Sequence, residues 1–199
     1  MCGRYDLSDN PAAIRARFAV PEVPVFSPNM DWRPTDSAPI LRLDAGGSRE
    51  CVLARWGLLP AWAPDLKFGT RCINARAETV AKLPAFRAAF RKRRCLVPVN
   101  AFFEWSGEKG RRLKWRITRR DEALFALAGL WEWWQDREAG EAVTSYTIIT
   151  CEANAAIAPL HDRMPVILRD ADYARWLSAD DGQALLAPCP PETLVLERC

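Results

Sequence analysis

Residues 95–105 read Cys95-Leu96-Val97-Pro98-Val99-Asn100-Ala101-Phe102-Phe103-Glu104-Trp105. Segments 95–99 and 101–105 have the length and composition that are typical of buried β-strands. Glu104 is the exception, because a carboxylate among aromatic rings is costly to bury without a partner. Apolar surroundings would raise the pKa of Glu104 and suit it to proton transfer near neutral pH. The alternative is an edge strand whose Glu104 points into water.

The segments on either side predict many more short strands, separated by a few helices. Strands are expected over residues 39–43, 51–56, 113–118, 124–131, 144–150, 166–168 and 193–196. Short helices are expected after the capping sequence 8–11, from Pro84 to the basic run 91–94, and over residues 152–157, 172–177 and 181–186. The proline-rich stretch 21–39 is expected to be irregular. This pattern predicts an α+β fold in which mostly antiparallel strands form a barrel-like or two-sheet core with several short helices.

The length and the cysteine content limit the class of protein. A chain of 199 residues that is 49% hydrophobic fits one domain, which we place at residues 1–199. The seven cysteines are an odd number without a Cys-x-x-Cys pair, which disfavours a zinc ribbon or a disulfide framework and indicates a reducing cytosol. No apolar run approaches the roughly 20 residues that span a bilayer. We therefore expect a cytoplasmic monomer without a membrane partner.

Charge is distributed unevenly along the chain. Residues 67–120 hold 16 Lys and Arg against 3 Asp and Glu, whereas residues 121–199 hold 5 against 14. A basic segment this concentrated indicates a polyanionic partner, most plausibly nucleic acid. The alternative is that the acidic C-terminal third folds back and neutralises the basic segment.

The chain begins Met1-Cys2-Gly3-Arg4. Because a small side chain follows Met1, we expect Met1 to be removed and Cys2 to become the N-terminal residue. An amine with a pKa of about 7.7–8.0 would then lie beside a thiol of about 8.5, and a modest positive field would raise the thiolate fraction. Such a pair condenses with an aldehyde to an imine, which the sulfur closes into a thiazolidine ring. The alternative is that Cys2 is an ordinary residue in a frayed terminus.

His161 is the single histidine of the chain and lies in a polar stretch between a predicted helix and a predicted strand. One histidine excludes two-histidine metal motifs and disfavours a zinc hydrolase. It leaves one imidazole for use as an acid, a base or an electrostatic clamp, or else as a structural turn residue. The sequence also lacks Gly-x-Ser-x-Gly, P-loop and Gly-x-Gly-x-x-Gly motifs, so we expect neither a metal nor a small-molecule cofactor.

Several motifs taken together resemble one family. They are Met1-Cys2-Gly3-Arg4-Tyr5, Arg55-Trp56-Gly57-Leu58-Leu59-Pro60, Ile73-Asn74-Ala75-Arg76-Ala77-Glu78-Thr79, residues 98–105, and His161-Asp162-Arg163-Met164-Pro165-Val166-Ile167-Leu168. In this combination the chain resembles the SOS response-associated peptidase (SRAP) family, whose members crosslink themselves to abasic sites in single-stranded DNA. There are two departures: Ala101 replaces the glycine usual in the family, and residues 29–39 follow the usual Asn-x-x-Pro-Thr pattern only loosely.

The resemblance implies roles for four residues and a DNA partner. Cys2 would capture the ring-opened aldehyde of an abasic deoxyribose, and Asn74 would orient the N-terminal amine or a sugar oxygen. Glu104 would move protons during imine formation and reversal, and His161 would help open the sugar ring and stabilise the alkoxide. The family's autoproteolytic exposure of this cysteine gives it its peptidase name, and in this chain either an aminopeptidase or autoproteolysis would expose Cys2.

The same motifs place basic side chains beside the reactive groups. We expect Arg4, Arg76 and Arg163 to contact phosphates of single-stranded DNA, with Thr150 as a weaker candidate. Trp62 lies in a proline-flanked loop and is expected to stack on a base, unless it is a core tryptophan. A protein with this activity would associate with the nucleoid when bound to DNA.

Two rival functions stay open at this point. One is a thiol peptidase that acts on other proteins, which would cleave peptides in trans without an aldehyde. The other is a non-covalent single-stranded DNA-binding module with an inert Cys2, which would bind intact and abasic strands alike.

Overall fold

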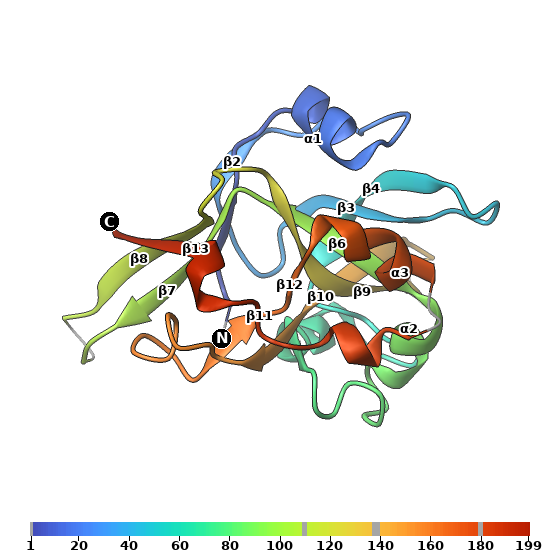
Figure 1. Ribbon diagram of the computed structural model, residues 1–199. Helices are drawn as coiled ribbons and strands as arrows, with labels where there is room; N and C mark the ends of the chain where they lie inside the picture. The colour runs from blue at the N-terminus through green and yellow to red at the C-terminus, as the bar shows by residue number, and fades with distance from the viewer. Residues whose placement is uncertain (1, 109–110, 137–139, 179–180) are drawn as a thin grey trace.

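The computed structural model describes residues 2–108, 111–136, 140–178 and 181–199. In these residues two β-sheets form the core, and short helices lie at their margins (Figure 1). The first sheet has the strand order β13 (Leu194–Arg198), β8 (Leu113–Arg119), β7 (Ala101–Ser106), β1 (Tyr5–Leu7) and β2 (Asn29–Trp32). The strands β7, β8 and β13 project to one side of the molecule, on the left in Figure 1.

The second sheet closes on itself. Its closed part runs β10 (Ala142–Glu152), β4 (Arg49–Trp56), β3 (Ser37–Leu43), β6 (Arg94–Val99) and β9 (Phe125–Gln135), and β9 then pairs with β10. Three short strands are attached to it: β5 (Asn74–Arg76), β11 (Arg163–Pro165) and β12 (Ile167–Leu168). The pairings are antiparallel except β10 with β4 and β10 with β5. The predicted α+β fold with a barrel-like core is therefore confirmed, whereas the domain span 1–199 stays a prediction.

Residues 95–105 join the two sheets, as their apolar sequence requires. Every residue of β6 is buried, because the strand lies inside the barrel wall between β3 and β9. At Asn100 the chain leaves the barrel and enters β7 of the first sheet. The Asn100 side-chain oxygen accepts hydrogen bonds from the backbone nitrogens of Ser8 and Asp9 at 3.0 and 3.1 Å, so the turn also holds the end of β1. This junction brings Glu104 next to the N-terminal strand.

The helices are short, and local capping explains the first of them. Helix α1 (Pro11–Phe18) starts after Asn10, whose Oδ1 accepts a hydrogen bond from the Ala13 nitrogen at 3.0 Å. The other helices are α2 (Arg87–Lys92), α3 (Tyr173–Ser178) and the 3₁₀ turns η1 (Leu66–Arg71), η2 (Asp170–Asp172), η3 (Gln183–Leu185) and η4 (Pro191–Thr193). None of the helices in the described ranges is long and apolar enough to cross a bilayer.

Three expectations about secondary structure are wrong. The stretch 21–39 is not wholly irregular, because β2 forms at its centre by pairing with β1. Residues 152–157 do not form a helix, since Asn154 Oδ1 accepts bonds from the nitrogens of Ala156 and Ile157 and fixes a turn instead. Within 181–186 only the 3₁₀ turn η3 is present.

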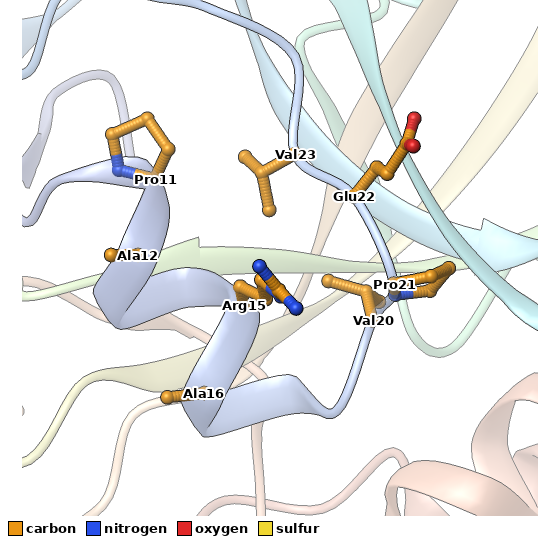
Figure 2. Close-up of a pocket in the computed structure, with 8 residues that line it drawn as sticks. All are labelled: Pro11, Ala12, Arg15, Ala16, Val20, Pro21, Glu22 and Val23. Carbon is orange, nitrogen blue, oxygen red and sulfur yellow. The ribbon is translucent and has the colours of Figure 1, made fainter.

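Helix α1 and the segment that follows it border a surface pocket. It is lined by Pro11, Ala12, Arg15, Ala16, Val20, Pro21, Glu22 and Val23 (Figure 2). None of these residues belongs to the site that the sequence predicts, and the lining offers no nucleophile. This pocket is therefore separate from the candidate site.

The basic run 91–94 is not simply a solvated helix end, because Arg94 is buried with 6% of its surface exposed. Its guanidinium carbon lies 4.8 Å from the Phe90 ring centre and 5.1 Å from that of Trp176. Arg94 Nε also donates to the Phe90 carbonyl oxygen at 2.9 Å. The flat cation thus serves as a core residue between two aromatic rings.

We expect Arg94→Ala to lower the free energy of unfolding by about 2–4 kcal/mol, because it removes a desolvated cation–π contact and leaves a buried carbonyl unpaired. Urea denaturation followed by tryptophan fluorescence measures this loss. Arg91→Ala, at an exposed position of helix α2 just before Arg94, is the control and should change stability by less than about 0.5 kcal/mol. Equal stabilities of the two variants would contradict the structural role of Arg94.

Candidate functional site

Cys2 lies inside the protein and not in a frayed terminus. Its residue surface is fully buried, and its carbonyl oxygen accepts a hydrogen bond from Asn74 Nδ2 at 2.9 Å. Asn74 is the first residue of β5, which pairs in parallel with β10 through Ile148 and therefore has a fixed position. Cys2 and Asn74 are 72 positions apart in the chain, and the fold brings them into contact.

The other end of the Asn74 amide is available for a ligand. Asn74 Oδ1 is buried and has no hydrogen-bond partner among the described residues. A buried amide oxygen without a partner costs about 1–3 kcal/mol, so such an atom calls for an explanation. An acceptor beside the N-terminal residue suits the N–H of a free amine or the hydroxyl of a sugar.

Glu104 is buried, with 3% of its surface exposed, so the solvated edge-strand alternative is wrong. Strand β7 carries it beside β1, where the Phe103 nitrogen donates to the Arg4 carbonyl oxygen at 3.0 Å. Burial raises the pKa of Glu104, and the nearby charge of His161 acts in the opposite direction. Glu104 in turn acts electrostatically on the Cys2 thiol, so these three residues form one cluster.

The expectation of a positive field that favours the Cys2 thiolate is wrong. Burial raises the pKa of the Cys2 thiol far above its ordinary value, and the charge of Glu104 raises it further. The sulfur is therefore a neutral thiol near pH 7 and has to lose its proton during a reaction. Glu104, whose pKa is also raised, lies in the same electrostatic cluster as this thiol.

His161 precedes β11 and is partly buried, with 29% of its side chain exposed. Its Nδ1 lies 2.9 Å from the Arg163 backbone nitrogen and 2.8 Å from Asp162 Oδ1. A neutral Nδ1 accepts from the Arg163 N–H, whereas a protonated Nδ1 donates to Asp162. The two contacts therefore belong to different protonation states of Nδ1, and in the neutral ring whose Nδ1 is the acceptor, Nε2 carries the proton and is a donor.

Sequence analysis missed the aromatic wall behind Cys2. The hydroxyls of Tyr5 and Tyr146 are 2.7 Å apart, and both side chains are fully buried. Trp56 packs against both rings, at centroid distances of 5.2 Å and 6.2 Å, and its Nε1 donates to the Ile73 carbonyl oxygen. The wall ties β1 to β4, β5 and β10 and keeps water from the back of the site. Tyr146 has no local sequence signal, because its partners are distant in the chain.

The arginines expected at the DNA interface differ in how firmly they are held. Arg163 donates to Glu78 at 2.6 and 3.0 Å and to the Thr150 carbonyl oxygen at 2.6 Å. Arg4 donates through one nitrogen to both oxygens of Asp31, at 2.6 and 2.7 Å. Asp31 and Glu78 are thus site residues that sequence analysis did not predict.

Arg76 and Thr150 lie side by side in the parallel pair of β5 and β10. The Arg76 side chain is exposed, which suits it to contact DNA. Thr150 is 1% exposed, and its hydroxyl lies 3.5 Å from the Ala75 carbonyl oxygen. In the structure Thr150 holds Arg163 in place through its backbone carbonyl oxygen. A contact between Thr150 and DNA stays a prediction.

Trp62 is on the surface, with 54% of its area exposed, so the alternative of a core tryptophan is wrong. Its ring contacts Phe68 edge-on, with the ring centres 5.0 Å apart. The loop that carries Trp62 is anchored near the site, because the Leu58 nitrogen donates to the Cys72 carbonyl oxygen two residues before Asn74. An exposed and braced indole is suited to base stacking.

The basic segment is partly neutralised. Salt bridges join Arg93 to Glu132, Arg116 to Asp6, and Arg119 to Asp121 and Asp170. The acidic C-terminal third thus supplies some of the counter-charges. This agrees with the alternative that it folds back and neutralises the basic segment. In contrast, Arg76 and Arg91 have exposed side chains.

The chain is similar in sequence to a known family and to several named proteins. The sequence model described as SOS response associated peptidase (SRAP) matches residues 1–198. The abasic site processing protein YoaM of Bacillus subtilis is 37% identical, covering 94% of this chain and 86% of that protein. The abasic site processing protein HMCES of Xenopus tropicalis is 30% identical, covering 76% of this chain and 54% of that protein.

Solved structures share the fold. A crystal structure of a Bacteroides thetaiotaomicron protein has a TM-score of 0.90 at 26% identity, covering 99% of this chain and 91% of that one. A Bordetella bronchiseptica protein has a TM-score of 0.86 at 30% identity, covering 100% of this chain and 99% of that one. On these grounds, the chain belongs to the SOS response associated peptidase (SRAP) family.

Proposed function

We propose that this protein senses abasic sites in single-stranded DNA and captures them as a covalent thiazolidine formed by Cys2. The observation that carries the proposal is the buried Cys2 bonded to Asn74, with Glu104 and His161 in the same electrostatic cluster. Relatives named abasic site processing proteins support the substrate class. The proposal requires a free amine on Cys2, and the expected loss of Met1 concerns a residue outside those that the structure describes.

The chemistry balances without an external oxidant or cofactor. The ring-opened abasic sugar offers an aldehyde, which the Cys2 amine attacks to give a carbinolamine. Loss of water gives an imine, and addition of the thiol forms the carbon–sulfur bond while the thiol proton ends on the ring nitrogen. The product is therefore the aldehyde plus the aminothiol minus one water.

Each polar group of the cluster is suited to a particular step of this reaction. Glu104 donates a proton to the departing water of the carbinolamine and takes up the proton that the nitrogen loses as the imine forms. In the next step it carries the thiol proton to the ring nitrogen. His161 donates from Nε2 to the sugar oxygen as the ring opens, and Asn74 Oδ1 accepts from the Cys2 amine. Holding these groups around one aldehyde corresponds to effective molarities of about 10⁵ M or more.

The same thiol and carboxylate also suit the autoproteolytic exposure of Cys2 that names the family. Attack of the Cys2 thiol on the carbonyl carbon of residue 1 would move the acyl group from nitrogen to sulfur and free the amine, with Glu104 as the proton carrier. Water would then hydrolyse the thioester, releasing residue 1 as a carboxylic acid and restoring the thiol. For DNA, we infer that Arg4, Arg76 and Arg163 contact phosphates and that Trp62 stacks on a base, with the protein acting as a monomer in the cytoplasm and at the nucleoid.

Incubation with single-stranded DNA that carries one abasic site should give a band of lower mobility on a denaturing gel. The band should survive heating, because the thiazolidine links protein and DNA covalently. The matched DNA control carries a tetrahydrofuran analogue at the same position, which cannot open to an aldehyde and should give no band.

The outcomes separate the rival functions. A DNA-binding module would shift both strands on a native gel and neither on a denaturing gel. A thiol peptidase acting on other proteins would cleave a peptide substrate in trans and ignore the abasic site. If the wild-type protein with a free Cys2 amine gave no heat-stable band, the proposed function would be wrong.

A further inference from the structure

The pairing of β1 with β2 sets an acidic side chain between two arginines beside the site. Tyr5 faces Trp32 in the register of these strands, and their rings stack with centroids 6.4 Å apart. Because side chains alternate along extended backbone, Arg4, just before β1, falls on the face that carries Asp31 of β2 and Arg33, just after β2. Strand β2 is the outer strand of its sheet, so this face lies at an edge of the molecule.

Asp31 uses both of its oxygens on the two arginines. Arg4 donates to Oδ1 and Oδ2 at 2.6 and 2.7 Å, and Arg33 donates to Oδ2 from Nε at 3.0 Å and from its terminal nitrogen at 2.6 Å. The side chains of Arg4, Arg33 and Asp31 are 33, 58 and 30% exposed. The cluster thus carries one net positive charge where Arg4 and Arg33 alone would carry two.

The carboxylate is charged throughout the neutral range. Burial acts to raise the pKa of Asp31, but the hydrogen bonds from Arg33 and Arg4 outweigh it and hold the pKa below its ordinary value. The pairing with Arg4 therefore persists at the pH of the cytoplasm, and protonation does not release it.

Arg163 is held more firmly than Arg4. Only 14% of its side chain is exposed, and besides Glu78 it donates to the backbone carbonyl of Thr150, which joins it to the barrel. In the part of the chain that the structure describes, the side-chain hydrogen bonds of Arg4 go to Asp31, a partly exposed acidic partner that an anion in solution can replace. Arg4 is thus positioned to exchange one anion for another.

We propose that Asp31 competes with DNA phosphate for Arg4 and Arg33, and so limits the affinity of the site for single-stranded DNA. The inference deepens the proposed function and rests on DNA passing over the Arg4 side of Cys2. On binding, a phosphate oxygen replaces an Asp31 oxygen at Arg4. The expected consequence is selectivity, because undamaged strands bind weakly and leave, whereas an abasic strand is retained by the covalent bond.

The test compares Asp31→Asn with Asp44→Asn, using fluorescence anisotropy of an intact single-stranded oligonucleotide at several salt concentrations. Asp44 is an exposed turn residue, and asparagine there keeps the oxygen that accepts from Gly46 and Ser48, so both variants change the net charge equally. Asp31→Asn should bind about 3- to 10-fold more tightly than Asp44→Asn at low salt, since it frees two exposed cations.

The salt dependence gives a second readout. Two released arginines should steepen the slope of log K against log salt by about 0.7–1.4, as expected for one or two added phosphate contacts on a single strand. Adding Arg4→Ala to Asp31→Asn should remove most of the gain. Thermal melts of each variant establish that the compared proteins are folded.

The results distinguish this inference from the proposed function. If the wild type crosslinks abasic DNA but Asp31→Asn binds like Asp44→Asn, or more weakly, the competitor role is wrong and the capture chemistry stands. If Asp31→Asn tightens binding while the wild type never crosslinks, the competitor role stands and the chemistry is wrong. Absence of binding by all of the proteins overturns both.

Discussion

Cys2→Ala is expected to eliminate the heat-stable complex with abasic single-stranded DNA and to leave affinity for intact single strands within about twofold of the wild type. The thiol is the only group in the cluster that can close the imine into a ring. Alanine fills most of the same buried space, so the neighbouring contacts of Asn74 and β1 should persist. Denaturing gels and anisotropy measure the two quantities.

The Cys2→Ala variant should retain the first step of the reaction, and this gives a second test. An N-terminal alanine still has an α-amine, so it should form an imine that borohydride reduction traps but that heating in water reverses. Cys199→Ala removes an exposed thiol and is the matched control, which should crosslink like the wild type. A heat-stable band from unreduced Cys2→Ala would show that another nucleophile carries the reaction.

Glu104→Gln should slow crosslink formation by about 10²–10⁴-fold, the range for loss of a general acid–base group. The pH profile should change as well. In the wild type the rate should rise as pH passes through the raised pKa of Glu104, because the carboxylate is the form that accepts the thiol proton. Glutamine cannot titrate, so this limb of the profile should disappear.

The same variant should not lose stability at neutral pH. Because the pKa of Glu104 is raised by folding, the native state binds more protons than the unfolded state between the ordinary and the raised value. Wild-type stability therefore falls as pH rises through that window, and Glu104→Gln lacks this contribution. Urea midpoints at pH 4 and pH 7 should show Glu104→Gln gaining relative to the wild type as pH rises.

Glu108→Gln is the control for both measurements, because Glu108 is exposed and only four positions away in the chain. It should match the wild type in rate and in pH dependence. A Glu104→Gln protein with wild-type rates across the pH range would remove Glu104 from the mechanism.

Local sequence patterns determined much of the secondary structure. The capping sequence around Asn10 identified α1, and the apolar stretch 95–105 identified two buried strands, because both signals depend on neighbours within a few positions. The pattern was misleading at 152–157, where the Asn154 side chain fixes a turn in a stretch of helix-favouring residues. Strand β2 was missed because it depends on its pairing with β1.

The candidate site residues could also be named from the sequence, through motifs around Cys2, Asn74, Glu104 and His161. The environment of these residues could not be predicted in the same way. The sequence suggested a field that favours the Cys2 thiolate, but burial and the charge of Glu104 favour the neutral thiol. A pKa depends on what surrounds the group in space, and the composition of a segment does not report that.

The sequence by itself therefore determined which residues are candidates for the chemistry and which short segments form strands. Only the tertiary structure decided which strands are neighbours: β1 lies between β7 and β2, β5 pairs with β10, and β9 pairs with β10 to close the barrel. It also decided that Arg4 is bonded to Asp31, 27 positions away, and that Arg94 is a core residue. The physical reason is that alternation shows which face of a strand is buried, whereas the partner across that face is set by register and topology.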